Sequence, residues 1–181
     1  MLEMCLAMLC DIPALVDPGA VMIKCGDDII IFDAQVCRWN LPGFTALAHR
    51  SPVDIALTHG VFCLALPDTT GADLPANPMC RRFTHKPSLE KMRRFGATLN
   101  ADKEAFTDST FLFDAAVTAK LLVWWDTECG GKPPPFELDA YGDMLQALGP
   151  EADGEYLGEG GGEGGGADLR RSLYETLRHA F

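Results

Sequence analysis

The sequence predicts an α/β protein, because short apolar segments bounded by Gly, Pro and Asp alternate with amphipathic segments along most of its 181 residues. Its composition, 48% hydrophobic and 23% charged, is typical of a globular chain and excludes wholesale disorder, a collagen repeat or a coiled coil. A chain of this length can bury a core of its own. We therefore expect one main domain in which helices cover a sheet.

The expected strands are apolar along their whole length instead of alternating, which is typical of strands buried on both faces. Ser88 and Asp114 precede helical patterns as N-cap residues, and Gly96 follows the first of these patterns. Strands are expected at residues 20–23, 29–32, 44–48, 61–66 and 110–113, and helices at residues 1–10, 89–95, 115–125 and 140–148.

The last thirty or so residues differ in composition from the rest of the chain. Residues 154–166 are almost entirely Gly and Glu, which predicts a flexible, self-repelling linker. Leu169, Leu173 and Leu177 then recur at helical spacing and predict a short amphipathic helix. We expect a main domain over 1–150, a linker over 151–166 and a terminal helix over 167–181.

The net charge of −11 disfavours nucleic acid and anionic membranes as partners. It remains compatible with a small anionic substrate, because local cations or a metal ion can reverse the sign within a cleft. The seven cysteines form no C-x-x-C pair, so neither a disulfide framework nor a zinc module is indicated, and a cytoplasmic protein is expected. The apolar start of the chain lacks a basic region and a cleavage site, so neither a signal peptide nor a membrane span is expected.

The first candidate functional segment contains Asp27 and Asp28, directly after an expected strand. Ligands of α/β sheets bind beyond the carboxyl ends of strands, and carboxylate oxygens are ligands that Mg²⁺ prefers. An acidic β-turn is the alternative interpretation, because Gly-Asp-Asp also suits a turn.

The second candidate segment contains His85 and Lys86. Pro87 is expected to hold Lys86 extended, just before the helix that Ser88 caps. A lysine beside free N–H groups of a helix start favours phosphate. A solvated basic cluster with Arg81, Arg82 and Lys91 is the alternative.

The third candidate segment contains Asp139, Tyr141 and Asp143. Two carboxylates four residues apart on one helical face repel each other unless they hold a ligand. Alternatively, Asp139 caps the helix and Asp143 favours its dipole, or Asp139 caps and Asp143 alone is functional. His59 and Asp108 flank other strands and could reach the same cleft, although a histidine at a strand start is often structural.

Taken in order, these segments resemble the fucose-1-phosphate guanylyltransferase family, also called GDP-L-fucose pyrophosphorylases, and the related domain of bifunctional fucokinase enzymes. The long last segment, from Glu137-Leu138-Asp139-Ala140-Tyr141-Gly142-Asp143 to Leu148-Gly149-Pro150, makes the resemblance specific. It is carried by residues 2–13, 26–29, 41–49, 58–62, 82–92, 106–109 and 137–150.

The resemblance implies a three-layer Rossmann-like nucleotidyltransferase fold of the nucleotide-diphospho-sugar transferase type. It also implies a reaction that joins GTP and L-fucose 1-phosphate into GDP-L-fucose and pyrophosphate with Mg²⁺. By analogy with sugar-nucleotide transferases in general, we assign three roles to the candidate residues. Asp27 or Asp28 and Asp143 would hold the metal, Lys86, Asp108 and His59 would be catalytic, and Lys86, His85, Asp139 and Tyr141 would bind the sugar phosphate.

The chain departs from the family pattern at both ends. Members carry an upstream Gly-rich loop that cradles the nucleotide phosphates, and the acidic Gly160-Gly161-Gly162 is no substitute for it. The β-helical part expected after residue 150 is also missing. We therefore expect an internal fragment, incomplete at its N-terminus and inactive alone. The alternative is a catalytically inactive binding or interaction module that keeps the fold without the nucleotide loop.

Overall fold

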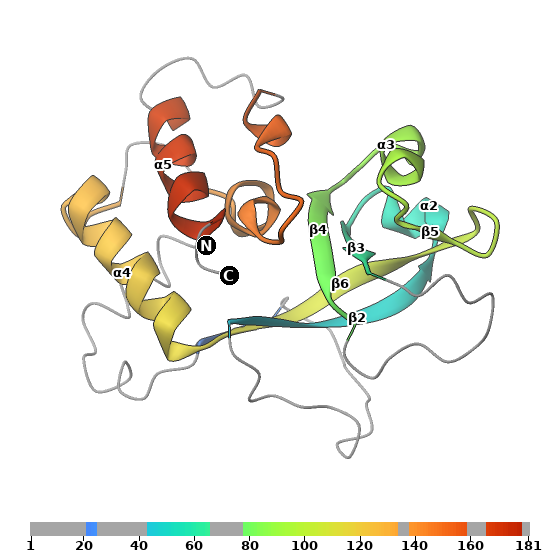
Figure 1. Ribbon diagram of the computed structural model, residues 1–181, viewed down its shortest axis with the longest axis horizontal. Coiled ribbons are helices and arrows are strands. Elements are labelled where there is room, and N and C mark those ends of the chain that lie inside the picture. The colour runs from blue at the N-terminus through green and yellow to red at the C-terminus, as the bar shows by residue number, and fades with distance from the viewer. Residues whose placement is uncertain (1–20, 25–42, 66–77, 134–137, 159–165, 179–181) are drawn as a thin grey trace.

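A six-stranded sheet built around the long strand β6 (Glu104–Phe113) is the centre of the molecule (Figure 1). The computed structural model describes residues 21–24, 43–65, 78–133, 138–158 and 166–178. β2 (Phe44–Pro52) pairs with β6 along its whole length. The strands β1 (Val21–Lys24), β3 (Gly60–Leu64) and β5 (Thr98–Leu99) therefore share the other edge of β6, and β4 (Cys80–His85) pairs with β3.

All pairings among the described strands are antiparallel. β5 and β6 have to be antiparallel, because parallel neighbours need a crossover of a dozen or more residues and the turn between these two strands is far shorter. Asn100, Ala101 and Asp102 all adopt positive φ values in it. The expected α/β class is confirmed, whereas the Rossmann-like arrangement is not confirmed and stays a prediction.

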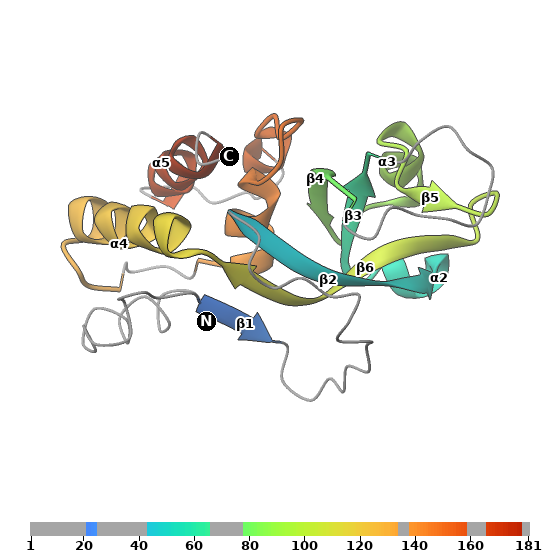
Figure 2. The ribbon, with the colours of Figure 1, turned by 60° about the horizontal axis from the view of Figure 1, so that its bottom comes forward.

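Two groups of helices pack against the sheet, one toward each end of the long strand β6 (Figure 2). The alternation of β3 divides the core: Phe62 belongs to a large aromatic cluster, while Val61 and Cys63 belong to a small cluster on the opposite face. The large cluster lies under α4 (Ala115–Cys129) and α5 (Gly166–Arg178), and the small one under α2 (Val53–Ala56) and α3 (Leu89–Arg94).

Both expected helix caps are confirmed. Ser88 accepts a hydrogen bond from the Lys91 backbone N–H at 3.1 Å at the start of α3. Asp114 accepts one from the Val117 N–H at 2.8 Å at the start of α4, and a second from the Gly43 N–H at 2.6 Å. The bond from Gly43, followed by that from Val117, holds the pKa of Asp114 below its usual value, so one carboxylate fixes α4 against the start of β2.

The helix expected over 140–148 is not a regular α-helix. It is a π-helical turn, η2 (Ala140–Met144), followed by a 3₁₀ turn, η3 (Leu145–Ala147). The carbonyl of Asp139 accepts from both Asp143 N at 2.8 Å and Met144 N at 3.3 Å, which widens the first turn. Such widened turns are frequent at functional sites.

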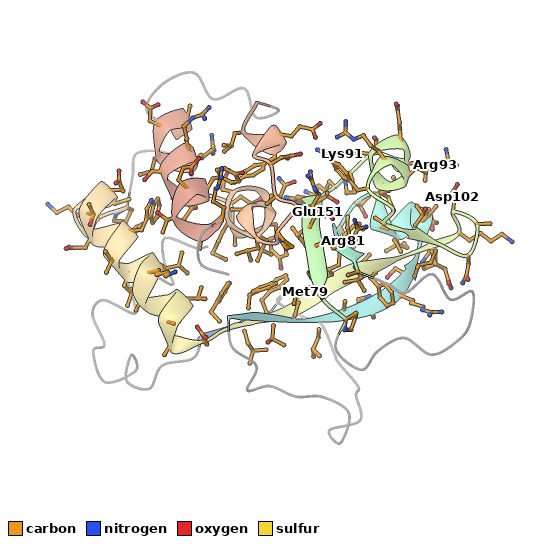
Figure 3. The ribbon with its side chains drawn as sticks, in the orientation of Figure 1. Met79, Arg81, Lys91, Arg93, Asp102 and Glu151 are labelled. Atoms are coloured by element: carbon orange, nitrogen blue, oxygen red, sulfur yellow. The ribbon has the colours of Figure 1, made fainter. Side chains whose placement is uncertain are left out.

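The C-terminal segments pack into the large cluster. Tyr156, from the short turn η4 (Glu155–Gly158), is buried there together with Leu173, Tyr174 and Leu177 of α5. Glu151 N donates to Arg81 O at 3.0 Å, and the two side chains form an ion pair at 2.9 Å between β4 and the segment after η3 (Figure 3).

Three of the expected elements cannot be compared with the structure. The expected helix over 1–10 and the expected strand over 29–32 lie outside the described residues, as do residues 159–165 of the expected linker. Among the residues that are described, no helix is both long and apolar enough to cross a membrane.

Candidate functional site

Three of the predicted residues meet at the end of β4. His85 is the last residue of β4 and pairs with Gly60 of β3, so Lys86 lies beside the turn that enters β3. The Lys86 N–H donates to the carbonyl of His59 at 2.9 Å across this pair. The antiparallel register of β3 and β4 thus brings the backbone of His59 next to Lys86, although the two residues are far apart in the sequence.

The η2 turn brings the third predicted segment to the same place. Asp139 Oδ2 lies 3.4 Å from Nδ1 of His85, and the Tyr141 ring centroid lies 5.8 Å from that of the imidazole. Gln146 ties the two segments together, since its Oε1 accepts from the His85 N–H at 3.1 Å and its Nε2 donates to the Gly142 carbonyl at 2.9 Å.

Gly142 is required for the close approach of η2 to β4. A Cβ atom at this position would lie 3.0 Å from Asp139 Oδ2 and 3.4 Å from His85 Nδ1. An alanine here would therefore require the Asp139 carboxylate to move by a few tenths of an ångström. Because Gly142 has no side chain, Asp139 and His85 can approach each other beside it.

The backbone of Lys86 corrects one expectation. Pro87 was expected to hold Lys86 extended, but its φ is +46°, in the left-handed region that non-glycine residues rarely adopt. The N–H bond to His59 and the sharp turn from β4 into the Ser88 cap of α3 impose this conformation. It costs about 1–2 kcal/mol, and such outliers cluster at binding and catalytic sites. The Lys86 side chain is exposed and forms no ion pair with any described residue.

The imidazole of His85 is uncharged at neutral pH and offers a hydrogen-bond acceptor. Burial lowers the pKa of His85, and the nearby Lys86 ammonium lowers it further, against the opposing effects of Asp139 and Asp143. His59 Nδ1 lies 2.9 Å from the Ile55 carbonyl and 3.0 Å from the Thr58 hydroxyl, so its imidazole contacts α2 and the turn that follows it.

Asp143 does not fit the predicted role of metal ligand. Its Oδ1 pairs with Arg170 Nε at 2.9 Å, and its Oδ2 accepts from the Asp139 N–H at 2.7 Å. The residue is buried, and burial is the main reason that its pKa is raised. The described part of the chain also contains no group of three His, Cys, Asp or Glu side chains that could hold a metal ion.

The remaining predicted residues cannot be placed at the site. Asp27 and Asp28 lie outside the described residues. Asp108 lies on β6 opposite Ala48 of β2, one residue from Thr107, which pairs with Val61. Its backbone is therefore near the start of β3.

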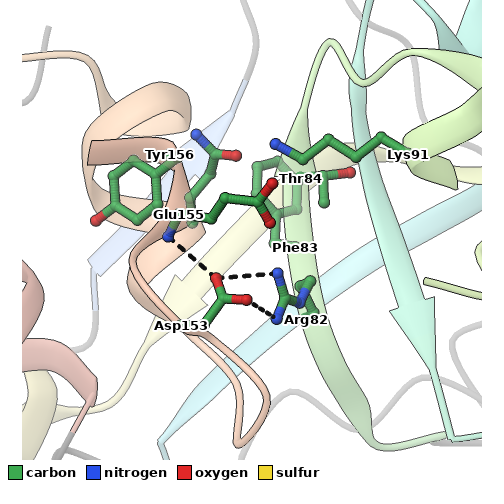
Figure 4. A pocket seen from close by; sticks show the side chains of 8 residues that line it. Arg82, Phe83, Thr84, Lys91, Asp153, Glu155 and Tyr156 are labelled. Carbon is green, nitrogen blue, oxygen red and sulfur yellow. Dashed lines mark hydrogen bonds and ion pairs between the residues drawn. The ribbon is translucent and has the colours of Figure 1, made fainter. Parts of the chain in front are cut away.

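A small pocket adjoins the site at the outer edge of β4 (Figure 4). Its carboxylates are already paired, because Asp153 binds Arg82 at 2.7 and 3.1 Å and Glu155 binds Arg94 at 2.6 Å. The hydroxyl of Thr84 is buried with no hydrogen-bond partner among the described residues. The lining residues are Arg82, Phe83, Thr84, Lys91, Gln146, Asp153, Glu155 and Tyr156.

Sequence reasoning missed two residues that shape the site, Gln146 and Arg170. Gln146 lies within the last candidate segment, so its position four residues after Gly142 was a usable signal. Arg170 lies beyond the Gly/Glu run, in a helix that the sequence sets apart, and no local pattern links it to Asp143.

The arrangement has the chemistry of a site for a small phosphorylated ligand. At the edge of an α/β sheet it places a lysine, the imidazole of His85, a carboxylate and a tyrosine, which together suit an anion carrying hydroxyl groups.

Comparison with known proteins defines the family. Residues 1–180 match the profile of the fucose pyrophosphorylase domain, beyond the end of the sequence motifs near residue 150. The chain is 40% identical to the fucose-1-phosphate guanylyltransferase of Homo sapiens over 179 residues, and 38% identical to that of Mus musculus over 178 residues. The chain belongs to the fucose pyrophosphorylase family.

The matches cover different shares of the proteins compared. They include 86% of this chain but only 29% of the human and 30% of the mouse protein, so the chain spans under a third of these relatives. No solved structure gives a significant match to the chain.

Proposed function

We propose that this chain supplies the sugar-phosphate-binding part of a fucose-1-phosphate guanylyltransferase site. The observation that carries the proposal is the position of Lys86, whose ammonium forms no ion pair with any described residue, beside His85 and the η2 turn. The activity for which the human and mouse relatives are named supports fucose 1-phosphate as the ligand.

In the proposed reaction an oxygen of the sugar phosphate attacks the α-phosphorus of GTP. The bond between the α-phosphorus and the bridging oxygen breaks, and pyrophosphate leaves with that oxygen. Such transfers need positioning and charge neutralisation more than covalent help. The nucleotidyltransferase fold, GTP as the second substrate, Mg²⁺ at Asp27 or Asp28 and a cytoplasmic location belong to this proposal.

The residues of the site divide the work by their chemistry. Lys86 neutralises the phosphate from an exposed position next to His85. Asp139 and the imidazole of His85 hold sugar hydroxyls, and Tyr141 provides an aromatic face beside them. His59 and Asp108 are the further catalytic candidates.

Calorimetric titration of the 181-residue chain with L-fucose 1-phosphate tests the proposal. Lys86→Gln keeps the aliphatic stem and removes the charge. Since a hydrogen bond to a charged group contributes about 1.5–3 kcal/mol, this change should weaken binding about ten- to a hundredfold. Lys103→Ala, an exposed lysine in the turn before β6, is the matched control and should leave affinity unchanged.

Two further ligands and one activity assay separate the alternatives. L-fucose and inorganic phosphate should each bind more weakly than fucose 1-phosphate, because each makes only part of the contacts. Pyrophosphate release from GTP should be negligible for this chain and should appear when flanking sequence extends it to the length of its relatives. Failure of wild type to bind the sugar phosphate, or an inactive extended chain, would favour an inactive interaction module.

A further inference from the structure

The C-terminal helix α5 reaches the candidate site through one side chain. Arg170 Nε lies 2.9 Å from Asp143 Oδ1 in an ion pair whose alignment is not that of a hydrogen bond, and the side chains of the two residues are only 25% and 10% exposed. The pair joins a helix beyond the Gly/Glu run to the η2 turn that carries Asp139 and Tyr141. No role in the proposed reaction accounts for this contact.

Asp143 transmits the contact to the start of η2. Its second oxygen, Oδ2, accepts from the Asp139 N–H at 2.7 Å, while its own N–H donates to the Asp139 carbonyl at 2.8 Å. The backbone of Asp139 is thus held at both polar groups by one residue. The Asp139 side chain remains directed to Tyr141 N, at 3.1 Å, and to His85 Nδ1, at 3.4 Å.

A second contact from the C-terminal region holds the same turn. The Tyr156 hydroxyl donates to the Asp143 carbonyl at 3.0 Å, and its ring packs edge-on against Tyr174 of α5. Tyr174 in turn donates to the Ala152 carbonyl at 3.0 Å. Asp143 is therefore held through its carboxylate and its carbonyl by residues that follow it in the chain.

Charge gives the pair a second effect. Asp139 and Asp143 lie four residues apart beside the place proposed for an anionic substrate. A buried carboxylate that loses its partner is strongly destabilised, and its uncompensated charge would repel both Asp139 and a phosphate. Arg170 removes this repulsion.

We infer that Arg170 is a positioning residue of the site: it fixes Asp143, and through it Asp139 and η2, against His85. The last helix is then a working part of the binding site and not an appendage. The inference rests on the proposed function for its effect on ligand binding, and on the contact geometry alone for its effect on η2.

Calorimetric titration with L-fucose 1-phosphate tests the effect on binding. Arg170→Met should weaken binding about tenfold, within the range of couplings between directly contacting groups, and Arg170→Lys should restore most of the loss. The matched control is Leu173→Ala, a fully buried residue of the same helix. It should lower the melting temperature at least as much as Arg170→Met while leaving affinity unchanged in the folded protein.

Amide and imidazole NMR spectra without ligand provide the readout that is independent of the proposed function. Arg170→Met should shift the amides of Asp139 and Tyr141 and the ring signals of His85, whereas Leu173→Ala should not. If wild type fails to bind the sugar phosphate, the proposed function fails and these shifts alone decide the positioning role. Unchanged η2 signals in Arg170→Met, or equal losses of affinity in both variants, would overturn the inference.

Discussion

Replacing Gly149 with alanine tests the close approach of the segment after η3 to β4. Gly149 has a φ of +100°, and a Cβ atom there would lie 2.8 Å from the carbonyl carbon of Arg81 and 3.1 Å from Arg82 N. It would also collide with the Arg81 oxygen, which accepts a hydrogen bond from Glu151 N. All three atoms belong to the backbone of β4, so no change of rotamer relieves the clash.

The expected loss of stability is the sum of four contributions. Left-handed strain in an alanine costs about 1–2 kcal/mol, and overpacking against a fixed backbone about 1–3 kcal/mol. Weakening the bond from Glu151 to Arg81 costs about 1 kcal/mol. The smaller entropy of the unfolded alanine chain offsets about 0.4–1 kcal/mol. Gly149→Ala should therefore lower the free energy of unfolding by about 2–6 kcal/mol.

Gly130→Ala is the matched control for this prediction. Gly130 ends α4 with a φ of +59°, but a Cβ atom there would meet nothing within 4 Å. Its cost is the backbone strain less the entropic offset, about 0.5–1 kcal/mol. Urea denaturation followed by circular dichroism measures both variants. If Gly149→Ala is no more destabilising than Gly130→Ala, the close approach to β4 is refuted.

Two further predictions concern α4 and His85. Asp114→Ala removes the bonds from Val117 and Gly43 and should cost about 2–3 kcal/mol in urea denaturation, whereas loss of the helix cap alone would cost about 1. Because the pKa of His85 is lowered from its usual 6.5, the unfolded chain binds its proton first as pH falls. The contribution of His85 should be fully present above pH 6.5 and be lost as pH falls through the lower folded pKa. His85→Gln should flatten this part of the stability profile, and an unchanged slope would contradict the burial of the imidazole.

Local chemistry allowed the sequence to predict much of the fold. The caps at Ser88 and Asp114 depend on neighbouring N–H groups, so the starts of α3 and α4 could be predicted from their own residues. The strand β4 was missed, since its charged residues Arg81 and Arg82 find partners in Glu151 and Asp153 that are distant in sequence. Its strand character depends on tertiary contacts that no local pattern records.

The candidate site shows the same division between local and distant causes. Lys86 and Asp139 could be predicted from their positions at element boundaries, because those positions present side chains to ligands. The left-handed backbone of Lys86 could not be predicted, since Pro87 favours an extended conformation for the residue before it and the hydrogen bond to His59 overrides that preference. The ion-pair partner of Asp143 could not be predicted either, because Arg170 lies in a helix that the Gly/Glu run separates from the candidate segments in the sequence.

Chemical-shift mapping of backbone amides during titration with L-fucose 1-phosphate tests the central claim most directly. If one ligand site lies where β3, β4 and η2 meet, the amides of His59, Lys86 and Tyr141 should shift together and saturate with a single dissociation constant. The same titration of Lys86→Gln should require far more ligand to reach those shifts. Saturable shifts confined to the pocket around Thr84, or to α4, would contradict a sugar-phosphate site at the end of β4.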